Sequence, residues 1–230
     1  MTSSDYTARL AGLILAPRKT ITKVALENSY WLPLLVVTLA LIGFRMSLLP
    51  ELIESYSSPE FVLKYSESGK LTEAEANEQI ALIKKTAPIV ILFESPILAI
   101  LSVSMMALII TLTGKTLFKS GMPFMPVFNM TAWTSIISAI PLYISIPVKL
   151  INPELDLPSN PAFFISEELA GSFFHEILTL FDVFMLWQIY LLSIGVSVLY
   201  SVNMQRSLSV IGTMFLIFTI LNAMFKGFVI

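Results

Sequence analysis

The sequence predicts an all-α integral membrane protein. We expect a five-transmembrane-helix bundle with an N-terminal amphipathic interfacial helix and short extramembrane helices in the first outer loop. Of the 230 residues, 56% are hydrophobic and 13% are charged, and the mean hydropathy is +0.81. Soluble domains carry about a quarter charged residues. The apolar residues also fall into separate blocks of about 20, the length that crosses a hydrocarbon core of roughly 30 Å.

Composition and motifs argue against several classes of function. The net charge of −2 gives no reason to expect nucleic-acid binding, and the lack of cysteine excludes disulfides and thiolate metal sites. The sequence contains no nucleophile–base pair, no set of metal ligands and no nucleotide-binding loop. We therefore expect no catalytic residue, no metal and no cofactor.

The sequence predicts a cytoplasmic amphipathic segment over residues 1–29. Pro17 suits the first turn of a helix, so we expect two short helical pieces that meet there. Their apolar residues would face the acyl boundary, and their basic residues would lie among anionic headgroups. An ordinary positively charged flank that sets topology is the alternative. The predicted membrane-surface residues are Arg9, Arg18, Lys19 and Lys23.

Residues 30–230 form the membrane domain. Its spans are predicted at about 30–49, 88–112, 124–148, 177–202 and 208–229. The third span contains Asn129, Trp133 and Pro141, and the acidic loop 50–87 separates the first two spans. Ser58-Pro59 and the capping box at Thr72-Glu73-Ala74-Glu75 are helix-start signals, which predict a short helical hairpin outside the membrane.

We expect the fourth span to be one continuous helix around which the bundle is organised. Asp182 lies inside it, and an isolated carboxylate facing lipid costs a few kcal/mol or more. Asp182 must therefore turn toward other protein or trapped water. Gly195 offers a point where another backbone can approach closely.

The distribution of Lys and Arg predicts the orientation. The N-terminal segment, the turn with Lys115 and Lys119 and the turn with Arg206 are short and basic, whereas the two longer loops are acidic. The positive-inside rule then places the N-terminus in the cytoplasm and the C-terminus outside.

Four charged residues form a predicted buried polar cluster: Arg45, Glu94, Asp182 and Lys226. At 1.5 Å per helical residue, all four fall in the outer third of the bilayer. Charges in a membrane pair or face water, so we expect Arg45 to contact Glu94 or Asp182, with Lys226 nearer the rim. The cluster is either a structural ion pair or a pocket that binds a lipid headgroup or a polar residue of a partner.

The chain resembles the Yip family, which is named for eukaryotic members that interact with Rab-type GTPases. Three features carry the resemblance. Pro17-Arg18-Lys19-Thr20-Ile21 leads into Trp31-Leu32-Pro33-Leu34, a turn with Gly114 and Gly121 precedes the third span with Pro141, and the fourth span carries Trp187 and Gly195. The resemblance implies five spans and a cytoplasmic N-terminus. Eukaryotic relatives usually have a long cytoplasmic N-terminal region, so the chain is more similar to the bacterial branch in inner membranes. Some bacterial relatives are associated with export-type ABC transporters, which implies an accessory role and supplies no catalytic residue.

The leading hypothesis is a non-enzymatic inner-membrane protein that acts as an accessory, scaffold or lipid-interacting subunit. Its expected partners are membrane lipids and either a membrane protein, such as an ABC transporter, or further copies of itself. A small transporter or channel that uses Arg45, Glu94 and Asp182 is the alternative. An intramembrane hydrolase would need Glu94 and Asp182 as an acid–base pair and ranks last.

The orientation is testable by chemical labelling. A single cysteine placed at Ser66, in the acidic loop between the first two spans, should react with a membrane-impermeant thiol reagent in intact cells. The protein has no cysteine of its own, so the signal is specific. Labelling only after lysis would contradict the orientation.

Overall fold

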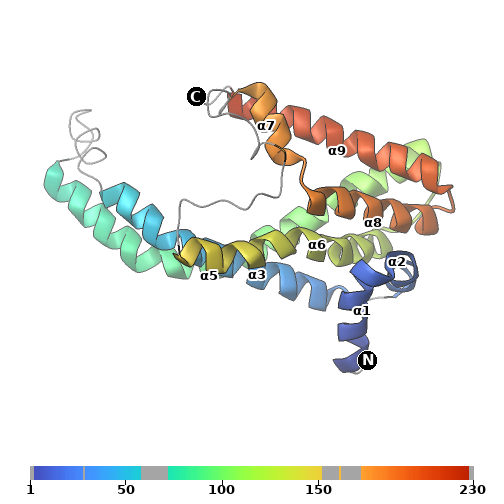
Figure 1. The fold of residues 1–230 in the computed structure, drawn as a ribbon, viewed down its shortest axis with the longest axis horizontal. Helices are drawn as coiled ribbons and strands as arrows, with labels where there is room; N and C mark the ends of the chain where they lie inside the picture. Colours follow the sequence, from blue (N-terminus) through green and yellow to red (C-terminus); the bar gives the residue numbers. More distant parts are fainter. Residues whose placement is uncertain (1–2, 28, 58–71, 152–160, 162–171, 228–230) are drawn as a thin grey trace.

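The computed structural model describes residues 3–27, 29–57, 72–151, 161 and 172–227, and the elements that it places among them are α-helices (Figure 1). Apart from α1, α2 and α7, these helices run roughly along one long axis (Figure 1). The helices are α1 (Ser3–Leu15), α2 (Pro17–Ala25), α3 (Trp31–Ser57), α5 (Glu73–Leu117), α6 (Phe124–Ile151), α7 (Phe173–Leu180), α8 (Val183–Leu199) and α9 (Met204–Gly227).

Within these residues, four helices are long and apolar enough to cross a membrane. The qualifying stretches are Trp31–Glu54, Asn77–Leu117, Phe124–Ile151 and Met204–Asn222. The apolar helix α8 has only 17 residues, which corresponds to about 25 Å. Four such helices make the protein a multi-pass membrane protein.

The predicted fourth span is not one continuous helix, so that expectation was wrong. The chain breaks at Phe181 and Asp182, between α7 and α8. Asp182 has an extended backbone, and its Oδ1 accepts a hydrogen bond of 2.6 Å from the N–H of Met185. A carboxylate that caps the first turn satisfies one of the unpaired N–H groups there. The same carboxylate that we expected inside a helix therefore begins one.

The first outer loop also differs from the predicted separate hairpin. Helix α3 continues through Pro50 to Ser57, and α5 runs without a break from Glu73 into the second span. The capping box is present at the start of α5, where Thr72 and Glu75 bond reciprocally. Hydrogen bonds from the backbone and side chain of Thr72 lower the pKa of Glu75. The Ser58-Pro59 signal lies outside the described residues.

Helix α6 is the centre of the bundle and packs against α2, α3, α5 and α8. Every residue from 127 to 137 is buried, so this stretch of α6 is enclosed on all sides. Three of its buried hydroxyl groups bond to carbonyls of α6 itself: Thr131 to Val127, Thr134 to Thr131, and Ser135 to Thr131. These bonds let polar residues occupy an apolar core without needing partners on other helices.

Small residues permit close packing at two levels of the bundle. A Cβ on Gly195 would lie 2.4 Å from Cγ of Met130 and 3.4 Å from Cγ2 of Ile21, so α8 touches both α6 and α2 at this point. Further along the bundle, one alanine from each of α3, α5 and α6 joins a second buried cluster: Ala40, Ala99 and Ala139. The close approach expected at Gly195 is therefore present, with side chains rather than a backbone as the neighbours.

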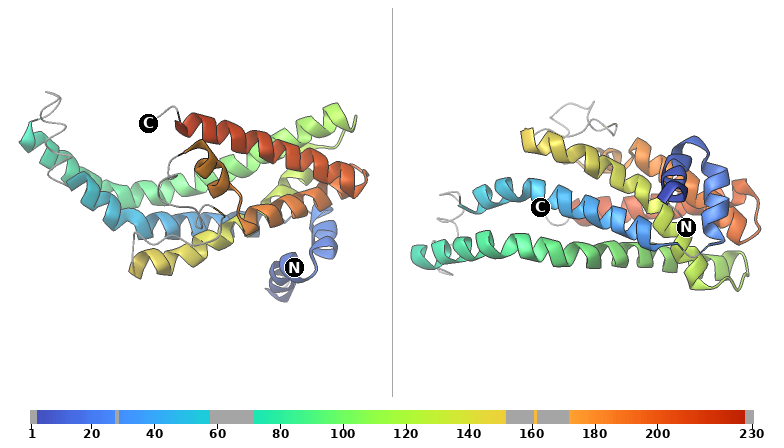
Figure 2. Two further views of the ribbon diagram at one scale, coloured as in Figure 1. Left: turned by 45° about the horizontal axis from the view of Figure 1, so that its top comes forward. Right: turned by 90° about the horizontal axis from the view of Figure 1, so that it is seen from below.

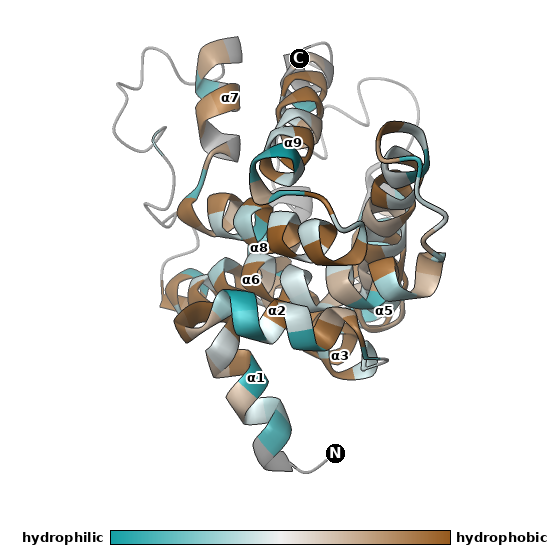
Figure 3. Ribbon diagram, turned by 90° about the vertical axis from the view of Figure 1, so that its right-hand side faces the viewer, coloured by the Kyte–Doolittle hydropathy of each residue, from teal (hydrophilic) through white to brown (hydrophobic). Residues whose placement is uncertain are grey.

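The helix ends near α2 define one end of the bundle, which we call the α2 end. The starts of α3, α6 and α9 and the ends of α5 and α8 meet there (Figures 1 and 2). Two hydrogen bonds tie them together, from Oη of Tyr200 to the carbonyl of Ile110 and from Nη2 of Arg206 to the carbonyl of Leu117. Figure 3 looks onto this end, where hydrophilic bands on α2 and α9 stand out from mostly hydrophobic helices.

Candidate functional site

Helix α2 is seated on the bundle rather than on lipid. Its buried residues, Thr20, Ile21, Val24 and Ala25, face α6 and α8. Ile21, Val24 and Leu13 of α1 are 0% exposed, so our placement of these apolar residues against the acyl boundary was wrong. The position of α2 on the bundle has a physical reason at the end of this helix, because a helix C-terminus leaves carbonyl groups without partners. Acyl chains offer no donor for them, whereas α6 does.

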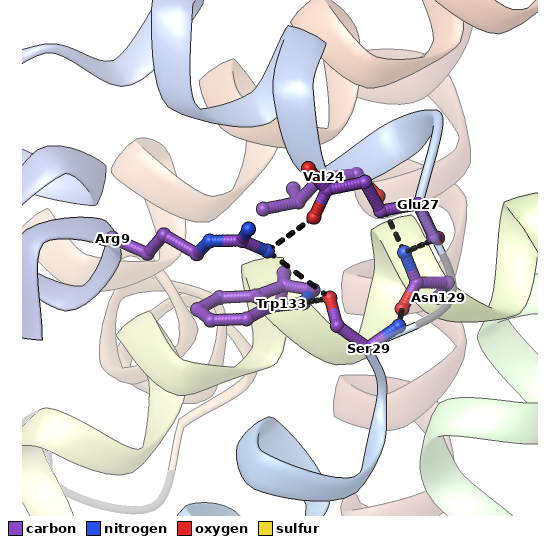
Figure 4. Close-up of polar contacts among 6 residues, drawn as sticks. All are labelled: Arg9, Val24, Glu27, Ser29, Asn129 and Trp133. Atoms are coloured by element: carbon purple, nitrogen blue, oxygen red, sulfur yellow. Dashed lines mark hydrogen bonds and ion pairs between the residues drawn. The ribbon is translucent and has the colours of Figure 1, made fainter. Parts of the chain in front are cut away.

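That donor is Asn129, which is 0% exposed (Figure 4). Its amide nitrogen donates to the carbonyls of Val24 and Glu27, at the end of α2 and just beyond it. Its amide oxygen accepts a bond of 2.9 Å from the N–H of Ser29. One side chain of α6 thus satisfies three backbone groups of the turn that joins α2 to α3.

A buried arginine completes this junction. Arg9 of α1 is 5% exposed, forms an ion pair with Glu27 and donates a bond of 3.4 Å from Nη1 to Oγ of Ser29. Its guanidinium carbon lies 5.8 Å from the centre of the Trp133 ring, and Nε1 of Trp133 donates to the same Ser29 hydroxyl at 3.0 Å. Pairing and ring contact offset the cost of burying the charge.

A second indole fixes the end of α1. Nε1 of Trp187 on α8 donates a bond of 3.1 Å to the carbonyl of Leu13. Helix α1 therefore has a hydrogen bond to α8 near its end, although its start projects away from the bundle (Figure 1). We name the residues that hold the N-terminal helices the N-terminal junction: Arg9, Val24, Glu27, Ser29, Asn129, Trp133 and Trp187.

The four predicted surface cations separate into two groups. Arg18, Lys19 and Lys23 are exposed, as membrane-surface residues must be. Arg9 is buried, so the prediction that it lies among the lipid headgroups was wrong. The side chain of Arg9 packs against Trp133 and Glu27, so its guanidinium meets its counter-charge inside the protein.

The predicted intramembrane charges are also divided. Nη2 of Arg45 lies 2.9 Å from Oε2 of Glu94, and these side chains are 33% and 42% exposed. Asp182 caps α8 instead. Lys226 belongs to the last turn of α9, and its side chain lies outside the described part of the chain. The structure thus joins α3 to α5 by an ion pair and gives Asp182 a separate role.

Sequence reasoning placed Asn129 and Trp133 in the third span but missed their roles, and it did not single out Glu27 or Ser29. Asn129 and Trp133 are four residues apart and so share one face of α6. An amide inside a span must find hydrogen-bond partners, which was the available signal. Nothing in the sequence, however, indicated that those partners lie about 100 residues earlier, beside the end of α2.

The junction predicts a large effect of one substitution. Asn129→Leu keeps a side chain of similar size but strands the carbonyl of Glu27 and the N–H of Ser29, and it leaves the carbonyl of Val24 with only its bond from the N–H of Glu27. Each buried group left unpaired costs about 1–3 kcal/mol, so the unfolding temperature in detergent should fall by several degrees. Asn77→Leu is the matched control, because Asn77 is exposed on α5. Equal effects of the two substitutions would contradict the role of Asn129.

Comparison with known proteins agrees with this arrangement of apolar helices. The model of the Yip1 domain family matches residues 11–225, which is nearly the whole chain and includes the Arg45–Glu94 pair and every residue of the junction except Arg9. No curated protein and no solved structure matches the chain. On the strength of a family match that begins in α1 and ends in α9, the chain belongs to the Yip family.

Proposed function

We propose that this protein is a non-enzymatic accessory subunit of a bacterial inner membrane, and that the exposed side of α2 docks onto an acidic surface of a membrane-protein partner. An export-type ABC transporter is the partner class that the family resemblance suggests. The proposal rests on one observation about α2. Its apolar side is enclosed by α6 and α8, while Arg18, Lys19 and Lys23 point away from them.

The N-terminal junction supports this role because it makes the basic side of α2 part of a fixed surface. A flexible basic tail would lose conformational entropy on binding, whereas a preorganised helix does not. Lys115, Lys119 and Arg206 are exposed at the same end of the bundle and extend the positive charge. Opposite charge across an interface raises the rate of encounter and suppresses wrong partners.

We infer that the α2 end is cytoplasmic and that the chain crosses the membrane five times. The positive-inside rule supports the orientation, since the exposed cations named above gather at this end. Helix α8 runs antiparallel to α9, and Oγ of Ser207 donates a bond of 2.6 Å to the carbonyl of Ser193 between them. Helices α7 and α8 together would then make the fourth crossing, with the break at Asp182 toward its outer end.

The partner is identified by crosslinking in the intact membrane. A photoreactive residue at Leu26, which is 73% exposed just after α2, should crosslink to one membrane protein in living cells. The double variant Lys19→Gln/Lys23→Gln should lower the crosslinked yield severalfold, because it removes two of the docking charges.

A charge-matched control gives the result its specificity. Lys84→Gln/Lys85→Gln removes two exposed lysines from the opposite end of the bundle and should leave the yield unchanged. Docking through α2 is contradicted if the Lys19/Lys23 variant keeps its crosslinked yield, or if the two double variants lose yield equally.

A small transporter or channel is the second candidate. The observation that favours it is the discontinuity between α7 and α8, because broken helices near substrate sites recur in transporters. Arg45 and Glu94 also keep partly exposed charges inside apolar helices. Solute flux into liposomes that contain only this protein, lost in Asp182→Asn, would select this function over the accessory role.

A further inference from the structure

We propose that the Arg45–Glu94 pair is a binding site for a zwitterionic phospholipid headgroup in the leaflet opposite the α2 end. In this site the guanidinium of Arg45 receives the phosphate, and the carboxylate of Glu94 receives the ammonium group. The site lies on α3 and α5, away from α2, so it does not depend on the docking function proposed above.

The depth of the pair suits a lipid headgroup. Arg45 follows Trp31, the first residue of α3, by 14 residues, or about 21 Å along the helix. Arg45 lies five residues after Ala40, and Glu94 lies five residues before Ala99, on the antiparallel helix. The pair is thus about 7.5 Å beyond the alanine contact, toward the end opposite α2. Long cationic side chains and thinning of the bilayer bridge the remaining distance to the headgroups.

The pair is accessible rather than sealed. A salt bridge that only fixed helix register would be expected inside the bundle, yet a third or more of each side chain is exposed. Val90 and Ile97 lie four residues before Glu94 and three residues after it, on the same face of α5, and both are more than half exposed. Glu94 therefore borders the surface of α5 that faces acyl chains.

The guanidinium also has unused donors. Nη2 bonds to Glu94, whereas Nη1 is enclosed and has no hydrogen-bond acceptor among the described residues. An unpaired charged donor in apolar surroundings is costly. For a phosphate to reach Nη1, the guanidinium must turn so that this nitrogen faces the open side while Nη2 stays on Glu94. A phosphate matches the planar guanidinium fork, and the outer leaflet supplies phosphates.

Charge complementarity selects the headgroup class. The pair has no net charge, so a purely anionic headgroup is attracted by Arg45 but repelled by Glu94. A headgroup that contains both a phosphate and an ammonium group presents one charge to each residue. Its acyl chains would lie along the exposed apolar side of α5, where Phe93 and Ile97 are 68% and 64% exposed.

The probe is short-chain phosphatidylethanolamine, added to the delipidated full-length protein in mild detergent and counted as bound adducts by native mass spectrometry. We expect it to bind at least tenfold more tightly than diacylglycerol with the same chains, which lacks the headgroup. Phosphatidylglycerol should fall between them, because it has the phosphate without the ammonium. Equal binding of phosphatidylethanolamine and diacylglycerol overturns the proposal.

The variants separate lipid binding from the structural role of the pair. Arg45→Leu alone strands Glu94 and lowers the unfolding temperature, so the decisive variant is Arg45→Leu/Glu94→Leu, which removes both charges. It should remain folded and lose at least tenfold in affinity for phosphatidylethanolamine. Lys84→Gln, which removes an exposed lysine ten residues before Glu94 on α5, should bind as the unmodified protein does.

Two outcomes overturn the assignment. Retention of tight phosphatidylethanolamine binding by the folded double variant places the lipid elsewhere. Displacement of the bound lipid by millimolar inorganic phosphate makes the site one for soluble phosphate. If the double variant does not fold, Glu94→Gln decides the question, because it should weaken phosphatidylethanolamine binding and leave phosphatidylglycerol binding unchanged or stronger. Weaker binding of phosphatidylglycerol with unchanged binding of phosphatidylethanolamine refutes the site.

Discussion

The carbonyl groups at the end of α2 need hydrogen-bond donors, and the buried side chain of Asn129 supplies them. Much of the α2 end follows from it. The amide holds the turn into α3, which places Ser29 within reach of Trp133 and Arg9. Position 195 of α8 is tightly packed for a different reason, because a Cβ there would meet the side chain of Met130 on α6, while Ile21 of α2 lies at ordinary contact distance. A single polar side chain in a buried helix thus holds both the end of α2 and the turn that leads into α3.

The sequence was most informative about the long apolar helices. The spans predicted at 124–148 and 208–229 correspond to α6 and α9 within a few residues. The capping box at Thr72 and Glu75 was identifiable because its spacing is local. Features set by distant contacts were not identifiable. Arg9 in an amphipathic segment has the same pattern whether its counter-charge is a lipid phosphate or Glu27.

The intramembrane charges show the same limit in another form. Opposite charges on apolar helices must meet a partner, but the sequence does not choose between Glu94 and Asp182 as the partner of Arg45. Asp182 instead has a local partner. Its carboxylate accepts a hydrogen bond from the backbone N–H three residues later, and a carboxylate in this position can mark the end of one helix and the start of the next. Hydropathy alone cannot detect such a break, since the residues on both sides of Asp182 remain apolar.

The N-terminal junction also has a consequence for biogenesis. Leu13 bonds to a residue 174 positions later, and Ser29 to one 100 positions later. During synthesis from the N-terminus, α1 and α2 emerge long before α6 and α8 exist, so contacts of such sequence separation form late. The N-terminal helices therefore cannot reach their final position until α6 and α8 have been made. The first part of the chain to be synthesised depends for its place on parts that are synthesised much later.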